Sequence, residues 1–327
     1  MANQAMGVYV KTRIIPEDEL RKLPTNLTNK VFELPFNSNT LASSQNTTNP
    51  GTMTGRRDAT EPILGNIDNS GNITLPLDTE ACGYLFAMAF GKPTTKGTTA
   101  SDGVKAPYTH VFKPKTQQPS FAVEKVFNNG IFALSKGVKV SKMSFSFGGD
   151  GELTVSADLM GCDEELNDRE TGTGAKAVKI NRLNNFQASM FIDGQEVSIV
   201  TELSLDIDFG LDGEGYAIGG KGYRGRINEG IITPSGTLKA FFDDKSLVDR
   251  AINSTITSIQ IKLTKGTNSL VIDLPECMFA RKTPAIDGAK GIVQELSYHA
   301  FFKENSDNSC VKITLTNGTA DYNAFTI

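Results

Sequence analysis

The sequence predicts a mainly β protein made of two similar β-sandwich or barrel domains, each with one flanking α-helix. The first observation is that apolar and polar residues alternate along most of the 327-residue chain, which places the two sets on opposite faces of a strand. The second is that Gly, Asn and Pro separate these runs, as is typical of many short strands joined by turns. The third is that the same order of elements occurs twice.

Two segments depart from this alternation and predict helices. Residues 78–91 read DTEACGYLFAMAFG, where Asp78 can cap the N-terminus and Gly91 the C-terminus. Residues 243–253 read DDKSLVDRAIN, where Asp243 can cap a helix whose apolar residues form one stripe. We therefore expect one helix in each half of the chain.

The segments around these helices also match in pairs. A Ser-Gly strand of the same length precedes each helix, at residues 70–78 and 235–243. Further pairs are residues 31–34 with 200–203, 120–125 with 258–262, and 152–160 with 293–302. We interpret the likeness as an internal duplication, since a solenoid would need three or more units. The predicted organisation is an N-terminal arm (1–30), a first domain (31–161), a linker (162–184), a second domain (185–303) and a C-terminal arm (304–327).

Composition narrows the class of protein. The net charge is −4 and the pI about 5.4, whereas a general nucleic-acid binder would normally carry a basic stripe. The four cysteines lie far apart and form no CxxC pair, which favours the reduced thiols of a cytosolic product over a disulfide framework. No apolar run approaches the length of a membrane span, and the N-terminus does not resemble a signal peptide.

No motif predicts catalysis, a cofactor or a metal. Residues 215–221 fit the first part of a phosphate loop, GxxxxGK, but Gly222 stands where a Ser or Thr would hold the metal. The spacing of Asp206, Asp208 and Asp212 fails the calcium-loop pattern. Neither of the two histidines belongs to a Cys/His cluster, and no GxSxG elbow occurs. We therefore expect no enzyme and no catalytic, cofactor-binding or metal-binding residues.

One strand stands out by its charge. Residues 202–212 read ELSLDIDFGLD, so one face carries Glu202, Ser204, Asp206 and Asp208, and the other carries Leu203, Leu205, Ile207, Phe209 and Leu211. Like charges on one strand face repel each other, and the simplest explanation is that the face looks at water. The first half is less acidic at similar places, with only Glu33, Asn37 and Asn39.

Three stretches carry a resemblance to a known family. They are GRRDATEPILGNIDNSGNITLPLDTEACGYLFAMAFG (55–91), YTHVFKP (108–114) and KVSKMSFSFGGDGELTVSADLMG (139–161). With the order strand, long loop, strand, Ser-Gly strand, capped helix and strand series, they resemble the tail tube (major tail) protein of long-tailed bacteriophages. The resemblance implies a tail-tube-like β-sandwich or barrel with one helix. It also implies that six copies form a ring, that rings stack into a tube, that the long loop touches the next ring, and that terminal arms reach neighbouring subunits.

The resemblance also implies roles for individual residues. The acidic strand face would line the channel, where repulsion keeps passing DNA from sticking to the wall. The candidate lumen-lining residues are Glu33, Asn37, Glu202, Ser204, Asp206 and Asp208. Two predicted loops, at residues 37–54 and 210–222, are rich in Asn, Thr, Ser and Gly. The candidate inter-ring residues in them are Asn46, Thr48, Gly51, Gly215, Tyr216, Gly219 and Lys221.

The expected protein is thus a structural virion protein without catalysis. Because each chain carries two units, three chains would form a pseudo-sixfold ring, with a homohexamer as the alternative. Its partners would be further copies of itself, a tape-measure protein and tail-end adaptor proteins, with transient non-specific passage of DNA and no membrane insertion. It would be assembled in the host cytoplasm and reside in the virion tail, of a siphophage or of a contractile phage.

The rival class is a two-domain β-sandwich binding module, an adhesin or a carbohydrate binder, against which the absence of Trp counts.

Overall fold

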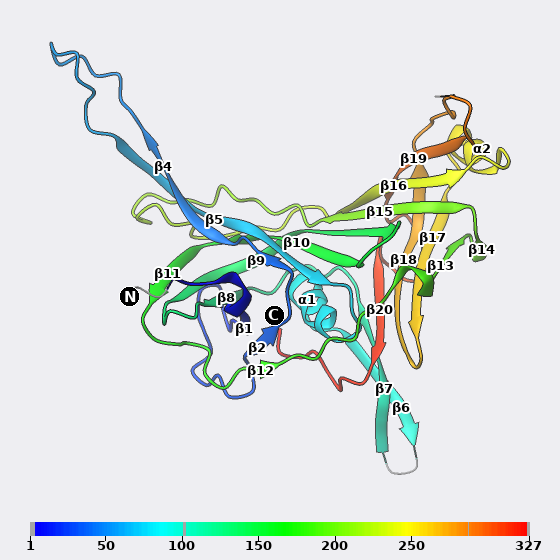
Figure 1. Cartoon of the computed structure of the whole chain (residues 1–327), viewed down its shortest axis with the longest axis horizontal. Coiled ribbons are helices and arrows are strands. Elements are labelled where there is room, and N and C mark those ends of the chain that lie inside the picture. Colours follow the sequence, from blue (N-terminus) through cyan, green and yellow to red (C-terminus); the bar gives the residue numbers. More distant parts are fainter. Residues whose placement is uncertain (1–3, 101–102, 287, 326–327) are drawn as a thin grey trace.

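The computed structural model describes residues 4–100, 103–286 and 288–325, and it confirms the prediction of a mainly β protein (Figure 1). The described residues contain two α-helices, α1 (Ala81–Phe90) and α2 (Ser246–Ile252), and two single turns of 3-10 helix, η1 (Gly7–Tyr9) and η2 (Asn185–Gln187). Within these ranges, none of the helices has the length and hydropathy that a membrane span requires.

The described residues also contain twenty strands, which pair antiparallel except for β12 with β2, which are parallel. In chain order they are β1 (Lys11–Pro16), β2 (Phe32–Leu34), β3 (Ser38–Asn39), β4 (Ala42–Thr48), β5 (Ile63–Pro76), β6 (Thr94–Ala100), β7 (Gly103–Phe112), β8 (Phe121–Val126), β9 (Phe132–Gly148), β10 (Thr154–Gly161), β11 (Asp163–Asn167), β12 (Lys176–Ala177), β13 (Ala188–Ile192), β14 (Gln195–Val197), β15 (Val200–Asp208), β16 (Thr233–Phe241), β17 (Thr257–Lys265), β18 (Asn268–Phe279), β19 (Val293–Ala300) and β20 (Lys312–Asn317).

One sheet runs through both halves of the chain, and we call it the main sheet. Its strands lie in the order β4–β5–β10–β9–β15–β16–β19. The junction between the halves is β9 with β15, which pair from Gly148 opposite Glu202 to Lys142 opposite Asp208. The first part of β9 belongs to a second sheet with β8 and β11, so this one strand joins both layers of the first half.

The order of strand pairing recurs in the two halves. In the first half it is β5–β10–β9–β8–β1, and in the second half it is β16–β19–β18–β17–β13. The predicted equivalence of residues 31–34 with 200–203 is wrong, however. Strand β2 pairs with β1 and β12 in the second sheet, whereas β15 lies beside β16. The strands that lie beside β5, as β15 lies beside β16, are β3 and β4.

Both predicted helices exist, and their starts differ from the prediction. All ten residues of α1 are buried, and the Asp78 carboxylate accepts hydrogen bonds from the backbone N–H groups of Glu80 (2.8 Å) and Cys82 (3.2 Å). Helix α2 begins at Ser246, whose backbone N–H group donates a hydrogen bond to the carboxylate of Asp244 at 2.7 Å. The capping carboxylate of α2 is therefore Asp244 and not the predicted Asp243, because the helix begins three residues later than expected.

The segments predicted to be arms and a linker are paired into the sheets. Residues 1–30 contain β1, which lies between β2 and β8, and residues 162–184 contain β11 and β12. Residues 304–327 contain β20, which lies between β18 of the second half and β7 of the first. The alternation in residues 312–317, KITLTN, already carries the signal of a half-buried strand.

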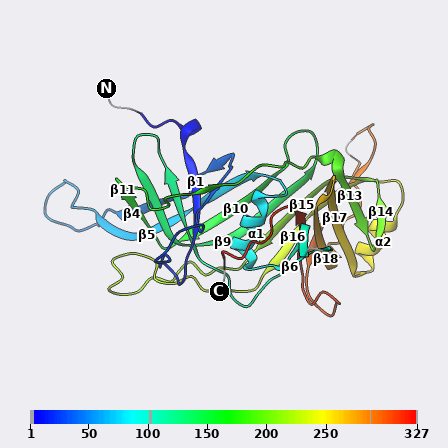
Figure 2. The ribbon, with the colours of Figure 1, turned by 90° about the horizontal axis from the view of Figure 1, so that it is seen from below.

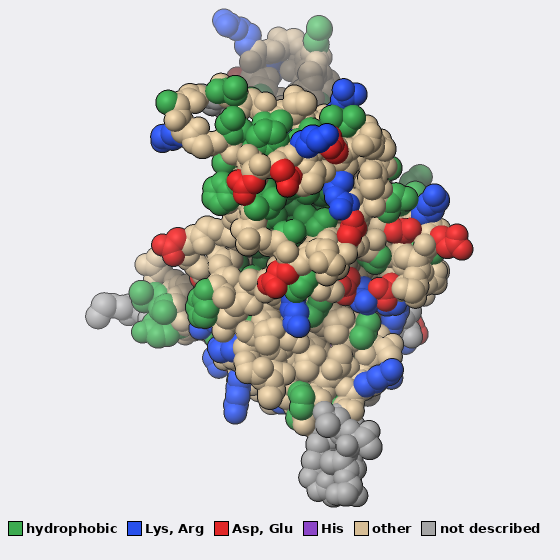
Figure 3. Space-filling model, turned by 90° about the vertical axis from the view of Figure 1, so that its right-hand side faces the viewer, with side chains coloured by type: hydrophobic (Ala, Val, Ile, Leu, Met, Phe, Trp, Pro, Cys, Tyr) green, Lys and Arg blue, Asp and Glu red, His purple; other side chains and the backbone are tan. Residues whose placement is uncertain are grey.

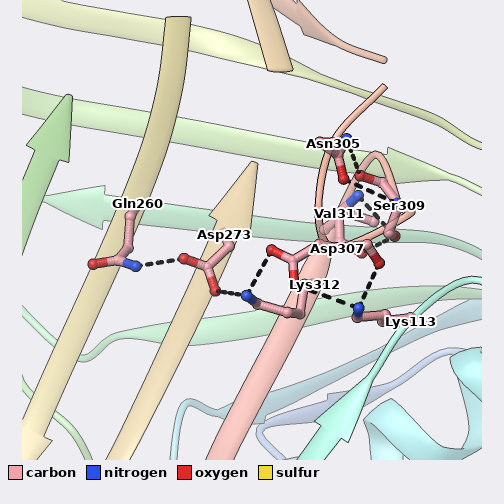
Figure 4. A network of polar contacts seen from close by, with 8 residues as sticks. All are labelled: Lys113, Gln260, Asp273, Asn305, Asp307, Ser309, Val311 and Lys312. Atoms are coloured by element: carbon pink, nitrogen blue, oxygen red, sulfur yellow. Dashed lines mark hydrogen bonds and ion pairs between the residues drawn. The ribbon is translucent and has the colours of Figure 1, made fainter. Parts of the chain in front are cut away.

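A polar network holds β20 in place on the sheet surface (Figure 4). The ammonium group of Lys312 lies 3.2 Å from the Asp273 carboxylate on β18 and 2.7 Å from that of Asp307. Lys113, at the end of β7, lies 3.4 Å from Asp307. The C-terminal strand is thus tied to both halves by charge as well as by backbone hydrogen bonds.

The C-terminal segment also completes the core of the first half. The ring of Phe325 lies 6.3 Å from that of Phe32 and 6.4 Å from that of Phe121. The hydroxyl group of Tyr322 donates to the carbonyl oxygen of Glu80 at 2.9 Å. A Cβ atom at Gly83 would lie only 2.2 Å from the Tyr322 ring, so the tyrosine fits against a glycine of α1.

Replacing Phe325 with alanine should lower the free energy of unfolding by about 3–5 kcal/mol, because a buried aromatic ring is lost from a packed core. Phe325 is only 1% exposed, whereas Phe186 is 84% exposed. The control F186A should therefore change stability by no more than about 0.5 kcal/mol. Urea unfolding of both variants checks this, and equal effects of the two changes would contradict the placement of the C-terminus in the core.

The cap of α1 should make stability depend on pH. Burial raises the pKa of Asp78 from 3.8 to about 6, although backbone hydrogen bonds oppose the shift. The folded state therefore binds this proton more tightly than the unfolded state, and the contribution is full below pH 3.8 and lost as the pH rises through about 6. Asp78→Asn cannot ionise, so its stability relative to the natural protein should increase between pH 4 and pH 7, by about 1–3 kcal/mol.

Urea titrations at several pH values measure this difference. Asp244→Asn is the matched control, because hydrogen bonds to Ser246 lower the pKa of the exposed Asp244 carboxyl group. Its difference from the natural protein should stay flat above pH 5. A pH-independent difference for Asp78→Asn would show that the buried carboxyl group ionises as an exposed one does.

Candidate functional site

The acidic strand identified in the sequence is β15, at the centre of the main sheet. Its apolar side chains, Leu203, Leu205, Ile207 and Phe209, are at most 3% exposed and face the core. On the opposite face Glu202 and Asp208 are exposed, and Ser204 and Asp206 are partly exposed. The alternation read from the sequence therefore describes this strand correctly up to its end at Asp208, after which Leu211 is only partly buried.

The neighbouring strands extend the same face with short polar side chains. Asp206 lies opposite Ser144 of β9 and Ser235 of β16, and Ser204 lies opposite Ser146 and Thr237. We call the whole surface the polar sheet face. It consists of Asn72, Thr74, Lys142, Ser144, Ser146, Ser156, Asp158, Glu202, Ser204, Asp206, Asp208, Ser235, Thr237, Lys239, Glu295, Ser297 and His299.

The polar sheet face carries a net negative charge. Five of its residues are acidic and two are lysines, which gives −3 with His299 neutral. Each lysine is held by an acid of β15, Lys142 by Asp206 at 3.0 Å and Lys239 by Glu202 at 2.6 Å. These pairs are exposed, so each adds only up to about 1 kcal/mol to stability. Their main consequence is that both cations already have an anionic partner.

Hydrogen bonds along the face keep its side chains flat on the sheet. The hydroxyl groups of Ser204 and Thr237 lie 2.8 Å apart, and the Asn72 amide donates to Ser156 and to Asp158, each at 2.7 Å. From the core side, the hydroxyl group of Tyr298 donates to the carbonyl oxygen of Ser204 at 2.7 Å. The result is a weakly acidic surface of hydrogen-bonded polar side chains that spans both halves of the chain.

The structure does not bring Glu33 to this face. Glu33 lies on β2 in the second sheet, where its carboxylate is 3.2 Å from Lys11 and 3.5 Å from Arg13. Asn37 lies beside the edge of the main sheet, since its N–H group donates to the carbonyl oxygen of Thr74 at 2.7 Å. Glu33 therefore does not share a face with β15, and the expectation that it holds a similar place depended on the equivalence of residues 31–34 with 200–203.

Sequence reasoning also missed most of the polar sheet face. It selected β15 by its charge, whereas residues of β9, β10, β16 and β19 make up the larger part of the surface. A signal was present in the alternation of residues 142–148, KMSFSFG, whose apolar members Met143, Phe145 and Phe147 are buried. The register that places these strands beside β15 could not be read from the sequence.

The first group of inter-ring candidates lies on a projecting hairpin. The predicted loop at residues 37–54 is partly strand, because β3 and β4 pair with β5. Asn46 and Thr48 are exposed on β4, and Gly51 is exposed in the connection at residues 49–62. Figures 1 and 2 both show that this β4–β5 hairpin extends beyond the end of the main sheet that lies opposite α2.

The second group lies in the connection between β15 and β16, which folds back on the first half. The hydroxyl group of Tyr216 donates to the carbonyl oxygen of Ile67 at 3.1 Å, and the N–H group of Ile67 donates to the carbonyl oxygen of Gly222 at 2.8 Å. Arg224 binds Asp68 at 2.6 Å and stacks over the Tyr216 ring at 5.3 Å. Of the predicted residues, Gly215 and Tyr216 are partly buried, whereas Gly219 and Lys221 are exposed.

The part of the chain that the structure describes holds no group of three or more His, Cys, Asp or Glu side chains able to bind a metal ion.

A search of curated proteins finds no match to this chain. A family model described as phage tail tube protein matches residues 9–300, a range that includes the main sheet and both helices. The chain therefore belongs to the phage tail tube protein family and is a structural component of the virion tail.

Proposed function

We propose that copies of this chain form closed rings, that the rings stack into the tail tube, and that the polar sheet face lines the channel through which the genome passes. The observation that carries the proposal is the main sheet itself, which is apolar on one face and continuously polar and acidic on the other across both halves. A sheet of this kind can form one segment of a wall, with its own core behind it and water in front.

The junction between β9 and β15 supports a way to close the ring. Strand β18 has the pairing position of β9 but ends at Phe279, and residues 280–286 after it are largely exposed. At the other end of the main sheet, β3 and β4 pair only with β5 within the described residues. Unpaired strand edges readily pair with another chain, and closure removes them. We infer that residues 280–286 of one copy lie beside β3 and β4 of the next.

The recurring pairing order supports three copies in such a ring. If each half is one unit, as the internal duplication predicts, three chains supply six units and give pseudo-sixfold symmetry. A ring of six chains is the alternative. Barrels of more than about 16 strands leave an aqueous channel, so a wall with several strands from each unit would be wide enough to hold water.

The charge of the face suits a channel for DNA. B-DNA carries about one negative charge per 1.7 Å of its axis, and it binds tightly wherever cationic groups are free. Here both lysines of the polar sheet face are paired with acids, and the net charge repels the duplex within a screening length of about 8 Å at physiological salt. Short hydrated side chains, mostly Ser and Thr, add few groups that could grip a base or a phosphate.

The other partners follow from this role. A tape-measure protein would occupy the channel during assembly, and adaptor proteins would close the two ends of the tube. Assembly would take place in the host cytoplasm. The protein would act without catalysis, by presenting a surface that does not bind what passes over it.

We expect concentrated protein to form rings or tubes in negative-stain electron microscopy, with a smallest ring of three chains by mass. Cysteines introduced at Thr283 and at Thr40, both exposed, should form a disulfide between copies. Cysteines at Thr283 and Thr267, an exposed residue in the β17–β18 turn, should not. A protein that stays monomeric at every concentration would overturn the proposal and favour a binding module.

Reversing the charge of the channel wall should slow DNA without preventing assembly. Asp206→Lys with Asp208→Lys changes the polar sheet face from −3 to +1 per chain, since two acids become two lysines. We expect normal tubes that retain DNA fragments at 150 mM salt and release them at high salt, with DNA ejection at least tenfold slower.

The matched control is Asp18→Lys with Asp168→Lys, the same change at exposed residues outside the polar sheet face. It should leave DNA retention and ejection unchanged. Equal behaviour of the two double variants would argue that the polar sheet face does not meet DNA.

A further inference from the structure

A hollow lined by lysine side chains lies on the paired strands β6 and β7, and we call it the lysine hollow. Its volume is about 500 Å³, and the residues that line it are Lys92, Thr94, Lys96, Thr109, Val111, Lys113, Pro114 and Lys115. The residues that alternate with these along β7, His110 and Phe112, are buried. The lysine hollow therefore opens on the side of β6 and β7 that faces away from the core.

The lysine hollow and the polar sheet face lie on opposite sides of the molecule. Helix α1 lies between them, because the ring of Phe86 is 5.6 Å from that of Phe112 on β7 and 6.3 Å from that of Phe145 on β9. Figure 1 shows the main sheet above α1 and β7 below it. Figure 3 shows Lys and Arg side chains on the lower part of the molecule, where β6 and β7 lie. In a tube whose channel is lined by the polar sheet face, the lysine hollow would open outwards.

The ammonium groups around the hollow have little negative charge to balance them. Lys92 and Lys96 are exposed, and neither ammonium group has a hydrogen-bond or ion-pair partner among the described residues. The ammonium group of Lys115 donates to the backbone carbonyl oxygen of Lys92 at 2.6 Å. Lys113 alone has a carboxylate partner, Asp307 at 3.4 Å, and the second oxygen of that carboxylate is bound by a lysine of β20.

Two of these charges also oppose each other. Burial and the charge of Lys92 together lower the pKa of Lys115. The hydrogen bond to the backbone of Lys92 keeps the Lys115 ammonium group close to this neighbour. A like charge disfavours the charged form of its neighbour, and an anion placed between the two reverses the effect. An anionic ligand would therefore relieve a repulsion that the fold leaves in place.

The residue types around the hollow favour phosphate over carboxylate. Lysine binds phosphate groups as a point charge, whereas planar, bidentate recognition of a carboxylate favours arginine. None of the described residues that line the hollow is an arginine. The hydroxyl groups of Thr94 and Thr109 can donate further hydrogen bonds to phosphate oxygens. The volume of about 500 Å³ also falls within the range of small-molecule sites.

We propose that the lysine hollow binds phosphate groups, two or more of them close together. Several negative charges are needed because four lysines surround the space and a single carboxylate is paired with one of them. Free polyphosphate and a cluster of anionic lipid headgroups present the same chemistry to these lysines. The site goes beyond the conduit function, since it uses no residue of the polar sheet face and does not require a ring.

Calorimetric titration with sodium tripolyphosphate tests the proposal. Lys92→Ala with Lys96→Ala removes two ammonium groups that have no partner in the fold. We expect this double variant to bind at least about tenfold more weakly, because charge-assisted hydrogen bonds are lost, and to unfold in urea as the natural protein does. Lys179→Ala with Lys290→Ala is the matched control, since both lysines are exposed and lie outside the hollow. It should change the affinity by less than about twofold.

Vesicles distinguish the two sources of phosphate. Co-sedimentation with phosphatidylglycerol vesicles but not with phosphatidylcholine vesicles, lost in Lys92→Ala with Lys96→Ala, would support lipid headgroups as the ligand. Binding of tripolyphosphate without binding to either vesicle would support free polyphosphate.

Three outcomes would overturn the inference. They are no binding of tripolyphosphate by the natural protein, an equal loss of affinity in the two double variants, and equally tight binding of a polyglutamate peptide of the same charge, which would indicate an acidic protein partner instead. The proposed function is tested separately, because Lys92→Ala with Lys96→Ala should form rings and tubes whether or not the lysine hollow binds phosphate.

Discussion

The pairing of β9 with β15 is the constraint on which the rest of the structure depends. It joins the two halves edge to edge, so that their inner strands form one sheet with a single polar face and one large hydrophobic cluster behind it. The pairing is stabilised from behind, because Leu205 lies opposite Phe145 and Ile207 opposite Met143, all buried. Each such side chain contributes about 1.5–3 kcal/mol on burial. A slip of one residue would turn the acids into the core and the leucines to water.

The two halves share a pairing order but close their cores in different ways. The first half uses a fully buried helix, the glycine at position 83 and the aromatic side chains of the C-terminus. The second half uses a short helix at its rim and leaves an open groove between β9, β13 and β15 that is lined by both polar and apolar side chains. The two ends of the main sheet therefore differ in chemistry. A projecting hairpin with exposed apolar residues lies at one end, and the groove lies at the other.

The helix capped by Asp78 and the acidic strand illustrate what could be predicted. Alternation over residues 202–209 places every side chain of β15 on its correct face, because a period of two leaves no other choice once one face is buried. The helix at residues 78–91 was recognised by its cap and by its apolar composition. By contrast, the sequence does not reveal that β2, which carries Glu33, lies in the second sheet, or that β1, β11 and β20 pair with other strands. These pairings join residues that are distant in the chain, and local pattern carries no information about them.

The sequence by itself determined the mainly β class, the presence of two helices, the two faces of β15 and the resemblance to tail tube proteins. These properties depend on residues that are close together along the chain, through period, capping and composition. Only the tertiary structure decided which strands lie beside β15, that Glu33 belongs to another sheet, and that the C-terminus closes one core while the other stays open. The physical reason is that strand register and core closure depend on hydrogen bonds and contacts between segments that are far apart in sequence, such as Phe325 and Phe32.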